Sequence, residues 1–337
     1  MNAKFVTIIL NLILFSIILH ASVLASVIVV GHKNPDTDAV VAAIAVAELK
    51  SRLATPATAY VQGEIMPETK YLLDLYGVQV PEKIQSVANQ KVILVDHADT
   101  TQSPDDLSKA ELVGIIDHHR LGGIITGAPI EVRMLPVGST ATIIRKMYAE
   151  SQLDISKTLA ALMVGAIITD TVVFKSPTTT PEDKLAATQL AAIAGIQDLT
   201  QFGMKLFEIK SDIGSKSGNE LLNRDLKTFE MNGKKIAVAQ LELMSLSDIR
   251  KKRDELLLSM KTLKNEQNYH SVFLMLTDIM IEGTELLYLS DEANIIEKAF
   301  SLTSQDNVSC WLAGTVSRKK QIIPFLDRAF KSKSPRI

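Results

Sequence analysis

Residues 26–38 read SVIVVGHKNPDTD, a short run of Val and Ile followed by a polar segment with one His and two Asp. The same arrangement returns in KVILVDHAD at 91–99 and in LVGIIDHH at 112–119. Short apolar runs rich in Val and Ile, bounded by polar residues, are typical of strands in a buried parallel sheet. The three stretches therefore predict an α/β fold in which ionisable side chains follow each strand.

The polar residues after these runs form three clusters of side chains that commonly bind metals. In open α/β sheets, ligands bind at the carboxyl ends of the strands, so we expect the three clusters to meet at one edge. The candidates there are His32, Asp36, Asp38, Asp96, His97, Asp117, His118 and His119. Taken alone, Asp36 and Asp38 could form a turn and a helix cap, and His97 could be a structural residue. Three clusters in succession favour a metal site, for more than one ion.

The type of ligand narrows the chemistry of this site. Carboxylates and imidazoles without thiolates suit Mn²⁺, Co²⁺, Mg²⁺ or Zn²⁺. Two such ions about 3.5–4 Å apart can activate a hydroxide for in-line attack on phosphorus, so we expect a phosphate ester or anhydride as substrate. Its oxygens need cations, which Lys227 and the segment SRKKQ at 317–321 can supply. Alternatively, Lys227 and the cations of 317–321 could be ordinary surface charges without a binding role. The sequence contains no P-loop and no G-x-G-x-x-G motif.

The composition predicts about two globular domains and gives no sign of nucleic-acid binding. The 337 residues are 47% apolar, which supports large buried cores. The formal net charge of -2 provides no basic field. The basic run at 250–253 is followed by Asp254 and Glu255, which is typical of a solvated helix face. A single cysteine, Cys310, excludes an intramolecular disulfide and a cysteine-based zinc site.

Residues 26–209 are expected to form the first domain, a doubly wound and mostly parallel sheet with a metal-binding catalytic role. Strands and helices alternate along this part of the chain, which favours that architecture. The pattern predicts helices at 39–53, 66–77, 154–171 and 181–195, and a strand at 57–63. A short acidic helix is expected between the strands at 91–95 and 112–116.

The polar, glycine-containing segment 210–218, KSDIGSKSG, predicts a linker or hinge between two domains. Residues 219–337 are then a smaller mixed α/β domain that binds substrate, with the active site between the two domains. Its elements are expected to be a helix at 219–231, a strand at 234–243, a charged helix at 247–265, and strands at 271–279 and 285–290.

Residues 1–25 differ in kind from the rest of the chain. Lys4 precedes an uncharged apolar stretch, and Val23 and Ala25 fit the small-residue positions before a signal-peptidase cut. We therefore expect a signal peptide and export, to the periplasm. The alternatives are an uncleaved membrane anchor and a start codon assigned too far upstream, which would leave a cytoplasmic protein. A strand starting at about Ser26 leaves no linker for an anchor.

At this point the motifs resemble one known family. GHKNPDTDA, ILVDH, IIDHHR, AIITDTVVFKSPT and VSRKKQIIP are similar to the motifs of family II, manganese-dependent inorganic pyrophosphatases of the DHH phosphoesterase superfamily. The resemblance runs in order from about Ser26 to about Arg328. The DHH motif alone identifies only the superfamily. The C-terminal SRKKQ, and the lack of a G-G-G-H-type motif, separate this family from the DHH exonucleases and oligonucleotide phosphatases.

The resemblance implies a metal role for six residues. It implies two Mn²⁺ per subunit, with Co²⁺ as an alternative. One ion would take His32 and Asp36, the other would take Asp38 and His118, and both would be reached by Asp96, as a bridge, and by Asp170. Asp117 and His97 would orient these ligands from behind.

The resemblance also implies the reaction. His119 would contact substrate and assist proton transfer, while Lys227, Arg318 and Lys319 would hold pyrophosphate, accompanied by Mg²⁺. A bridging hydroxide would attack one phosphorus directly, giving two phosphates, after closure of the domains about 210–218.

Partners and competing functions follow from the same resemblance. It implies a homodimer through the first domain, with no nucleic acid and, after signal cleavage, no membrane. The alternatives are a related DHH phosphoesterase acting on short polyphosphate or small nucleotides, and a non-catalytic protein that binds metal or phosphate. Members of this family are generally cytosolic, so an export signal would be a departure from it. Such a signal would leave the physiological substrate open but would not change the expected chemistry.

Overall fold

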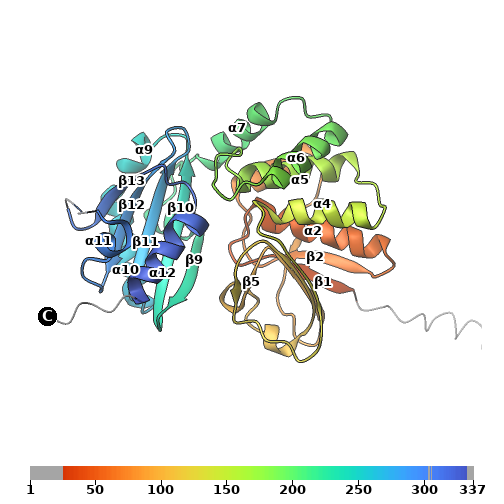
Figure 1. Cartoon of the computed structure of the whole chain (residues 1–337), viewed down its shortest axis with the longest axis horizontal. Helices are drawn as coiled ribbons and strands as arrows, with labels where there is room; N and C mark the ends of the chain where they lie inside the picture. Colours follow the sequence, from red (N-terminus) through yellow and green to blue (C-terminus); the bar gives the residue numbers. More distant parts are fainter. Residues whose placement is uncertain (1–25, 303, 305, 332–337) are drawn as a thin grey trace, which may run out of the picture.

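The computed structural model describes residues 26–302, 304 and 306–331, which form two main sheets (Figure 1). The predicted signal peptide, residues 1–25, lies outside the described residues. Within the described ranges, no helix is both long enough and apolar enough to span a bilayer.

The first domain is built on a six-stranded sheet in the order β3-β2-β1-β4-β6-β8, and every pairing in it is parallel. Its strands are β1 Val27–Val30, β2 Ala57–Val61, β3 Glu82–Lys83, β4 Lys91–Val95, β6 Glu111–Asp117 and β8 Glu131–Met134. The chain runs outward in one direction from β1 to β3 and then in the other from β4 to β8, so the direction switches between β1 and β4. A switch point of this kind creates a crevice at the carboxyl ends of the strands.

Helices cover one face of this sheet in two layers (Figure 1). They are α2 Thr37–Arg52, α3 Pro67–Leu75, α4 Thr140–Glu150, α5 Lys157–Asp170, α6 Pro181–Ala194 and α7 Leu199–Lys210. Helix α5 is buried from Leu159 to Thr169, because α2, α4, α6 and α7 all pack against it. This is why its sequence is apolar on all sides rather than amphipathic.

The other face of the sheet packs on loops and short turns. The acidic helix expected between 91–95 and 112–116 is wrong: the segment holds a two-residue strand, β5 Ala98–Asp99, and two 3₁₀ turns, Thr100–Gln102 and Leu107–Lys109. Its aspartates bond to nearby backbone instead. Asp99 accepts from Thr101 N, and Asp106 accepts from the backbone N–H groups of Val87 and Ala88. Side-chain bonds of this kind compete with helix formation.

The second domain is a five-stranded mixed sheet in the order β13-β12-β11-β10-β9. The pair β10–β11 is parallel and the other pairs are antiparallel. The strands are β9 Leu226–Met231, β10 Lys234–Leu243, β11 Ser271–Asp278, β12 Gly283–Ser290 and β13 Ser309–Ala313. The helices α8 Gly218–Asn223, α9 Ser247–Arg250 and α10 Arg253–Glu266 pack on one face, and α11 Ile295–Phe300 and α12 Ile323–Lys331 pack on the other. The predicted α/β architecture with a smaller mixed domain is confirmed.

The helix expected at 219–231 is wrong over its second half. It ends at Asn223, and Leu226–Met231 is strand β9. An Asn-Gly turn joins β9 to β10, with φ of 51° at Asn232 and 71° at Gly233. Two residues with positive φ are the mark of a tight hairpin turn, and Asn-Gly is its usual sequence. The correction matters because it puts Lys227 on an edge strand.

Strand β9 forms the seam between the two domains, as Figure 1 shows. Asn34 Nδ2, in the loop after β1, donates to the carbonyl of Leu226 at 3.1 Å. Thr101 Oγ1 donates to the carbonyl of Thr228 at 3.4 Å. The backbone of β9 therefore contacts the loops at the carboxyl edge of the first sheet.

Candidate metal centre and substrate pocket

The structure brings the six predicted metal ligands, together with His119, to the carboxyl edge of the first sheet. Their ligand atoms fall into three groups whose members lie within 4.8 Å of one another: Asp96, His118 and His119; His32, Asp36 and Asp96; and Asp38, His118 and Asp170. They come from the loop after β1, the start of α2, the ends of β4 and β6, and the end of α5. Parallel strands that end at one edge produce this convergence.

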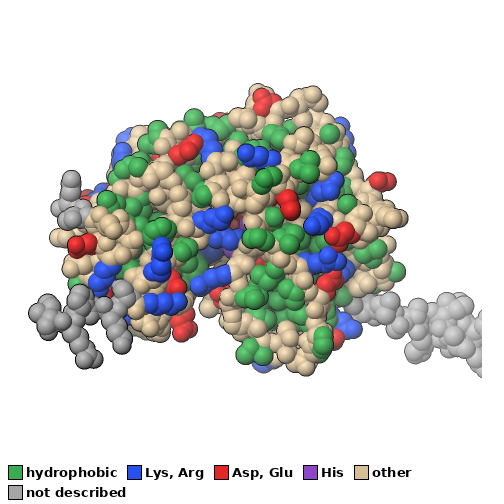
Figure 2. Space-filling model, in the orientation of Figure 1, with side chains coloured by type: hydrophobic (Ala, Val, Ile, Leu, Met, Phe, Trp, Pro, Cys, Tyr) green, Lys and Arg blue, Asp and Glu red, His purple; other side chains and the backbone are tan. Residues whose placement is uncertain are grey.

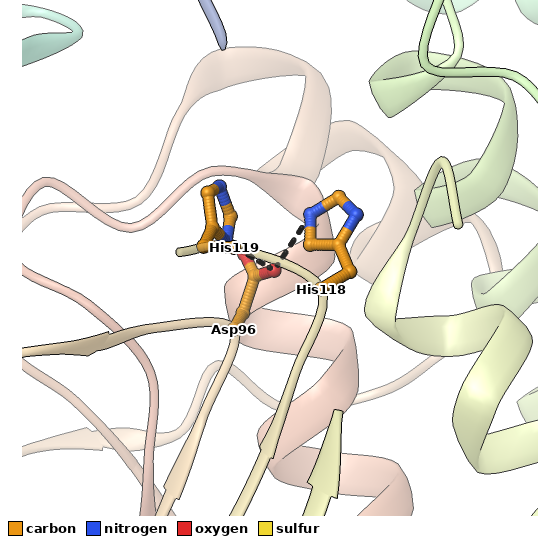
Figure 3. A group of neighbouring side chains, drawn as sticks. All are labelled: Asp96, His118 and His119. Atoms are coloured by element: carbon orange, nitrogen blue, oxygen red, sulfur yellow. Dashed lines mark ion pairs between the residues drawn. The ribbon is translucent and has the colours of Figure 1, made fainter. Parts of the chain in front are cut away.

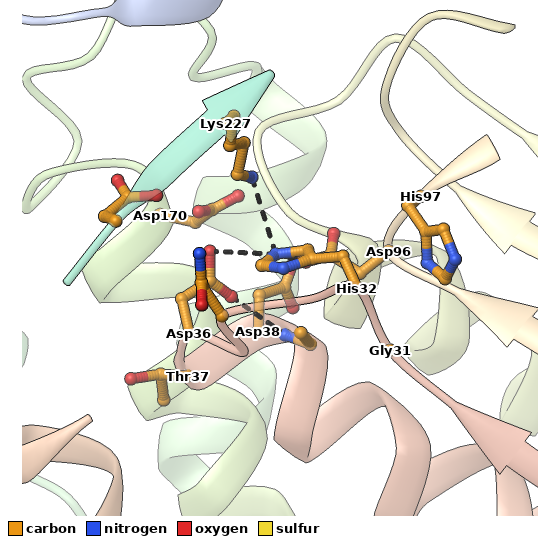
Figure 4. A network of polar contacts seen from close by, with 12 residues as sticks. Gly31, His32, Asp36, Thr37, Asp38, Asp96, His97, Asp170 and Lys227 are labelled. Carbon is orange, nitrogen blue, oxygen red and sulfur yellow. Dashed lines mark hydrogen bonds and ion pairs between the residues drawn. The ribbon is translucent and has the colours of Figure 1, made fainter. Parts of the chain in front are cut away.

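Asp96 lies between the two halves of the cluster (Figures 3 and 4). Its Oδ2 is 3.4 Å from His32 Nε2, and its Oδ1 is 3.4 Å from His118 Nε2. The backbone of Asp96 has φ of 58°, a left-handed conformation that is uncommon outside glycine. This conformation, directly after β4, turns the carboxylate into the site and is typical of a functional position.

The two histidines are oriented with one ring nitrogen toward the cluster. Nδ1 of His32 lies 2.7 Å from the carbonyl of Lys33, and Nδ1 of His118 lies 2.9 Å from the carbonyl of Val137. A carbonyl accepts, so each Nδ1 carries a proton, and Nε2 is the ring nitrogen that faces the carboxylates. Nε2 of His118 is buried and makes no hydrogen bond to any described residue, although Asp170 Oδ2 is 3.2 Å away. An orphaned buried nitrogen that faces carboxylates fits a metal ion.

Asp36 caps helix α2 with one carboxylate oxygen and faces the cluster with the other. Its Oδ1 accepts from Ala39 N at 3.0 Å and caps α2, while its Oδ2 is 3.3 Å from His32 Nε2. The helix cap therefore fixes the carboxylate and leaves the second oxygen for a ligand role.

The buried carboxylates of the cluster would be stabilised by a bound cation. Burial, followed by the nearby Asp96 and Asp170 carboxylates, raises the pKa of Asp38 well above its usual value. Burial and Lys227 act to lower the pKa of His32, but Asp36 and Asp96 outweigh them and raise it to about 10. Buried carboxylates at this density require compensating positive charge. The donor set of carboxylate oxygens and imidazole nitrogens suits Mn²⁺, so the residues present fit the metal.

Asp117 and His97 lie behind the cluster. Asp117 Oδ1 accepts from the backbone N–H of His118 at 2.7 Å and from Nδ1 of His119 at 2.9 Å, so it holds both histidines. His97 is buried, with Nδ1 2.9 Å from the carbonyl of Val95, and burial lowers its pKa to about 4. The structure does not bring His97 into any of the three ligand groups.

A cavity of about 420 Å³ joins this cluster to the second domain. Its wall includes Asp96 and His119 from one side and Lys227, Arg318 and Lys319 from the other. Lys227 Nζ is 3.4 Å from His32 Nε2, and Lys319 donates to the carbonyl of His118. Figure 2 shows Lys and Arg side chains gathered along the boundary between the domains. The three predicted substrate cations therefore face the three ligand groups.

Sequence reasoning missed other residues at this site. Ser139 and Thr140, at the start of α4, contact the carboxylates of Asp38 and Asp96. A Ser-Thr pair before a helical run is an N-cap signal, which could have revealed the helix but not its contacts. The cavity wall also includes Glu68, Arg120, Lys210, Arg224 and Asp225. These positions carry no local motif, so only the fold brings them to the wall.

The fold and the site together define a two-domain phosphoesterase of the DHH type. A model of the DHH family N-terminal domain matches residues 26–167, and a model of the DHHA2 domain matches residues 204–329. A probable manganese-dependent inorganic pyrophosphatase of Archaeoglobus fulgidus is 44% identical, over 90% of this chain and 98% of the relative. The manganese-dependent inorganic pyrophosphatase of Methanocaldococcus jannaschii is 42% identical, over 90% of this chain and 98% of the relative.

A solved structure agrees with these relatives. The crystal structure of a Methanococcus jannaschii protein described as a family II inorganic pyrophosphatase matches with a TM-score of 0.85 and 39% identity, over 91% of this chain and 100% of that one. The chain belongs to the family of manganese-dependent, family II inorganic pyrophosphatases. The resemblance drawn from the motifs is confirmed.

Proposed function

We propose that this protein is an inorganic pyrophosphatase that uses Mn²⁺ to hydrolyse pyrophosphate to two phosphates. The observation that carries the proposal is the position of Asp96, between two groups of ligands and facing a cavity lined by cations. One water is consumed, the P–O–P bond breaks, and both products leave as phosphate. The names of the relatives support the same activity and the same metal.

We assign the metal ligands as two sets that share Asp96. His32 and Asp36 would hold one Mn²⁺, and Asp38 and His118 the other, with Asp170 reaching both. Two bound ions would lower the pKa of the attacking water and stabilise negative charge on the phosphoryl oxygens. Co²⁺ prefers similar ligands, and Mg²⁺ would arrive with the substrate.

The cations of the second domain would bind and orient the substrate. Lys227, Arg318 and Lys319 face the cluster and would neutralise the oxygens of pyrophosphate and of the leaving phosphate. His119 is held at Nδ1 by Asp117, so its Nε2 is available to contact substrate and to move a proton. In this proposal, carboxylates and imidazoles of the first domain bind the metal ions, and cations of the second domain bind the anionic substrate.

We propose that residues 26–209 and 219–337 close on the substrate about a hinge at 210–218. Helix α7 ends at Lys210 and α8 begins at Gly218, so a short irregular connection joins the two domains. The contacts of β9 with the first domain, and of Lys320 Nζ with the carbonyl of Pro177 at 2.8 Å, are those expected of a closed arrangement.

We propose a homodimer formed through the free edge of the first sheet. Strand β8 pairs with β6 and has no second neighbour among the residues that the structure describes. Val132 on this strand is 48% exposed, and Leu121 and Ile125 nearby in sequence are 70% and 94% exposed. A second copy of the chain would cover these apolar side chains and pair the edge.

Export to the periplasm stays a prediction from residues 1–25, with a cytoplasmic protein as the alternative. Mass spectrometry of the N-terminal peptide, on protein isolated from the cells that naturally produce it, distinguishes export from a cytoplasmic location. A chain that begins at Ser26 supports export, and a chain that retains residues 1–25 contradicts it.

Substrate choice tests the proposed function against its nearest alternative. We expect Mn²⁺-loaded protein to release phosphate from pyrophosphate much faster than from tripolyphosphate or a dinucleotide, because its relatives are named as inorganic pyrophosphatases. Faster turnover of tripolyphosphate or of the dinucleotide would identify the protein as a different DHH phosphoesterase.

A further inference from the structure

The N-terminus of α4 lies directly against the carboxylate of Asp38. Ser139 Oγ donates to Asp38 Oδ1 at 2.9 Å, Thr140 N donates to Oδ2 at 2.6 Å, and Ala141 N donates to Oδ1 at 3.1 Å. The first N–H groups of a helix have no partner within the helix, so this carboxylate takes that place. Three of its roughly four acceptor positions are used, which leaves one for a metal.

The side chain of Thr140 reaches a second carboxylate. Its Oγ1 donates to Asp96 Oδ1 at 2.9 Å, and both residues are buried. Thr140 therefore contacts Asp38 through its backbone and Asp96 through its hydroxyl. The two carboxylates come from different strand ends, after β1 and β4.

We propose that Thr140 is a positioning residue for the metal centre: its hydroxyl fixes the carboxylate plane of Asp96 between the two ligand sets. Rotation about the last bond of an Asp side chain is soft, so a carboxylate without a partner samples a broad range of angles. The Thr140 hydrogen bond at Oδ1 leaves Oδ2 facing His32, and the second lone pair of Oδ1 available toward His118. This inference rests on the proposed function for the identity of the metal.

Thr140 can serve this role because its own position is fixed from α6. Asp183 is fully buried, accepts from Gly138 N at 2.8 Å, and accepts from Thr142 Oγ1 at 2.7 Å. These two contacts lie on either side of Thr140. A Cβ added at Gly138 would lie 2.7 Å from Thr171 Cγ2 and 2.8 Å from Asp183 Oδ2, so the turn is tightly enclosed. The hydroxyl is thus held by the scaffold and not by the metal.

The test is calorimetric titration of Mn²⁺ into the metal-stripped full chain, without substrate. Thr140→Val keeps the shape of the side chain and removes the hydroxyl, and Thr140→Ser restores the hydroxyl. We expect Thr140→Val to weaken Mn²⁺ binding by about 10–100-fold, the usual effect of losing a residue that orients a ligand. Thr140→Ser should bind close to wild type. Should Thr140→Val lose the native circular dichroism spectrum, Thr140→Ala takes its place.

A matched control separates this role from ordinary packing. Thr284 is also fully buried, and its Oγ1 donates to the carbonyl of Thr315 in the second domain at 2.6 Å. Thr284→Val should lower the melting temperature of the metal-free protein without changing the Kd for Mn²⁺. Wild-type Mn²⁺ affinity in Thr140→Val, or an equal loss in Thr284→Val, would overturn the inference. Because this readout needs no hydrolysis, it stays distinct from failure of the proposed function, in which two Mn²⁺ bind and pyrophosphate is not cleaved.

Discussion

Arg318 is bound to Asp225 through two different groups. Arg318 Nη2 donates to Asp225 Oδ1 at 2.8 Å, and Nη1 donates to the Asp225 carbonyl at 2.7 Å. Asp225 directly precedes β9, two residues before Lys227, whereas Arg318 begins the turn Arg318–Ile322. Two cations from distant parts of the chain are therefore held as one unit before the substrate arrives. Such preorganised charge is what stabilises phosphoryl transfer.

Loss of the Asp225 carboxylate should weaken substrate binding without affecting the metals. A hydrogen bond to a charged group contributes about 1.5–3 kcal/mol, so Asp225→Asn should lower kcat/KM for pyrophosphate by about 10–100-fold, mainly through KM. Arg318→Ala should raise KM further and lower kcat. Steady-state phosphate release, with Mn²⁺ content measured on the same samples, checks both. Unchanged kcat/KM in Asp225→Asn would mean that Arg318 is positioned by other contacts.

Asp96→Ala should abolish metal binding and activity together. Asp96 faces His32 and His118 with separate oxygens, so its loss would remove a ligand from both sets at once. Metal content after gel filtration, with Asp74→Ala as the control, measures the effect. Asp74 is exposed and pairs with Lys70 on the surface of α3. Two Mn²⁺ retained per subunit in Asp96→Ala would contradict the shared-ligand assignment.

Glu68 should stabilise the closed arrangement of the domains. Its buried carboxylate lies 4.0 Å from Lys210 Nζ, at the start of the hinge, and 3.9 Å from Arg224 Nη2 of the second domain. Neither of its oxygens makes a hydrogen bond within the described part of the chain, and burial raises its pKa. Opening would hydrate this carboxylate and move Arg224 of the second domain away from it.

We therefore expect Glu68→Gln to raise KM by at least about fivefold and to increase the radius of gyration of the substrate-free protein in small-angle scattering. The control is Glu285→Gln, which removes an ion pair with Arg250 inside the second domain and should change neither quantity. Equal radii and equal KM values for the two variants would exclude a role in closure.

A charge on the free sheet edge should separate the proposed dimer. Val132→Asp puts a carboxylate on β8, where the account expects the second copy, while Leu258→Asp alters a side chain that is 66% exposed on α10. In light scattering after size exclusion, wild type and Leu258→Asp should have twice the chain mass of 36.9 kDa. Val132→Asp should have the mass of a single chain. A dimer that survives Val132→Asp must use another surface.

The cluster of candidate metal ligands could be predicted from sequence because most of its residues follow strands whose order fixes their position. His32, Asp96 and His118 each lie just after a Val- or Ile-rich run, and parallel strands bring such ends together. Asp170 has no such signal, since it ends a helix. Its role came only from resemblance to a family motif.

The contacts that hold the site in place could not be predicted in the same way. Asp225 with Arg318, Thr140 with Asp96, and Glu68 with Arg224 each join residues far apart in sequence. Periodicity and capping rules report on neighbours within a few residues. Strand β9 shows a different failure: its Asn-Gly turn was visible, but the helix-forming residues before it led to a helix that continued too far.

The most direct test of the central claim is phosphate release from pyrophosphate by metal-stripped protein, measured before and after Mn²⁺ is restored. We predict no release from the stripped protein and strong release once Mn²⁺ is bound at Asp96 and its neighbours. Protein that binds two Mn²⁺ and still leaves pyrophosphate intact would contradict this claim.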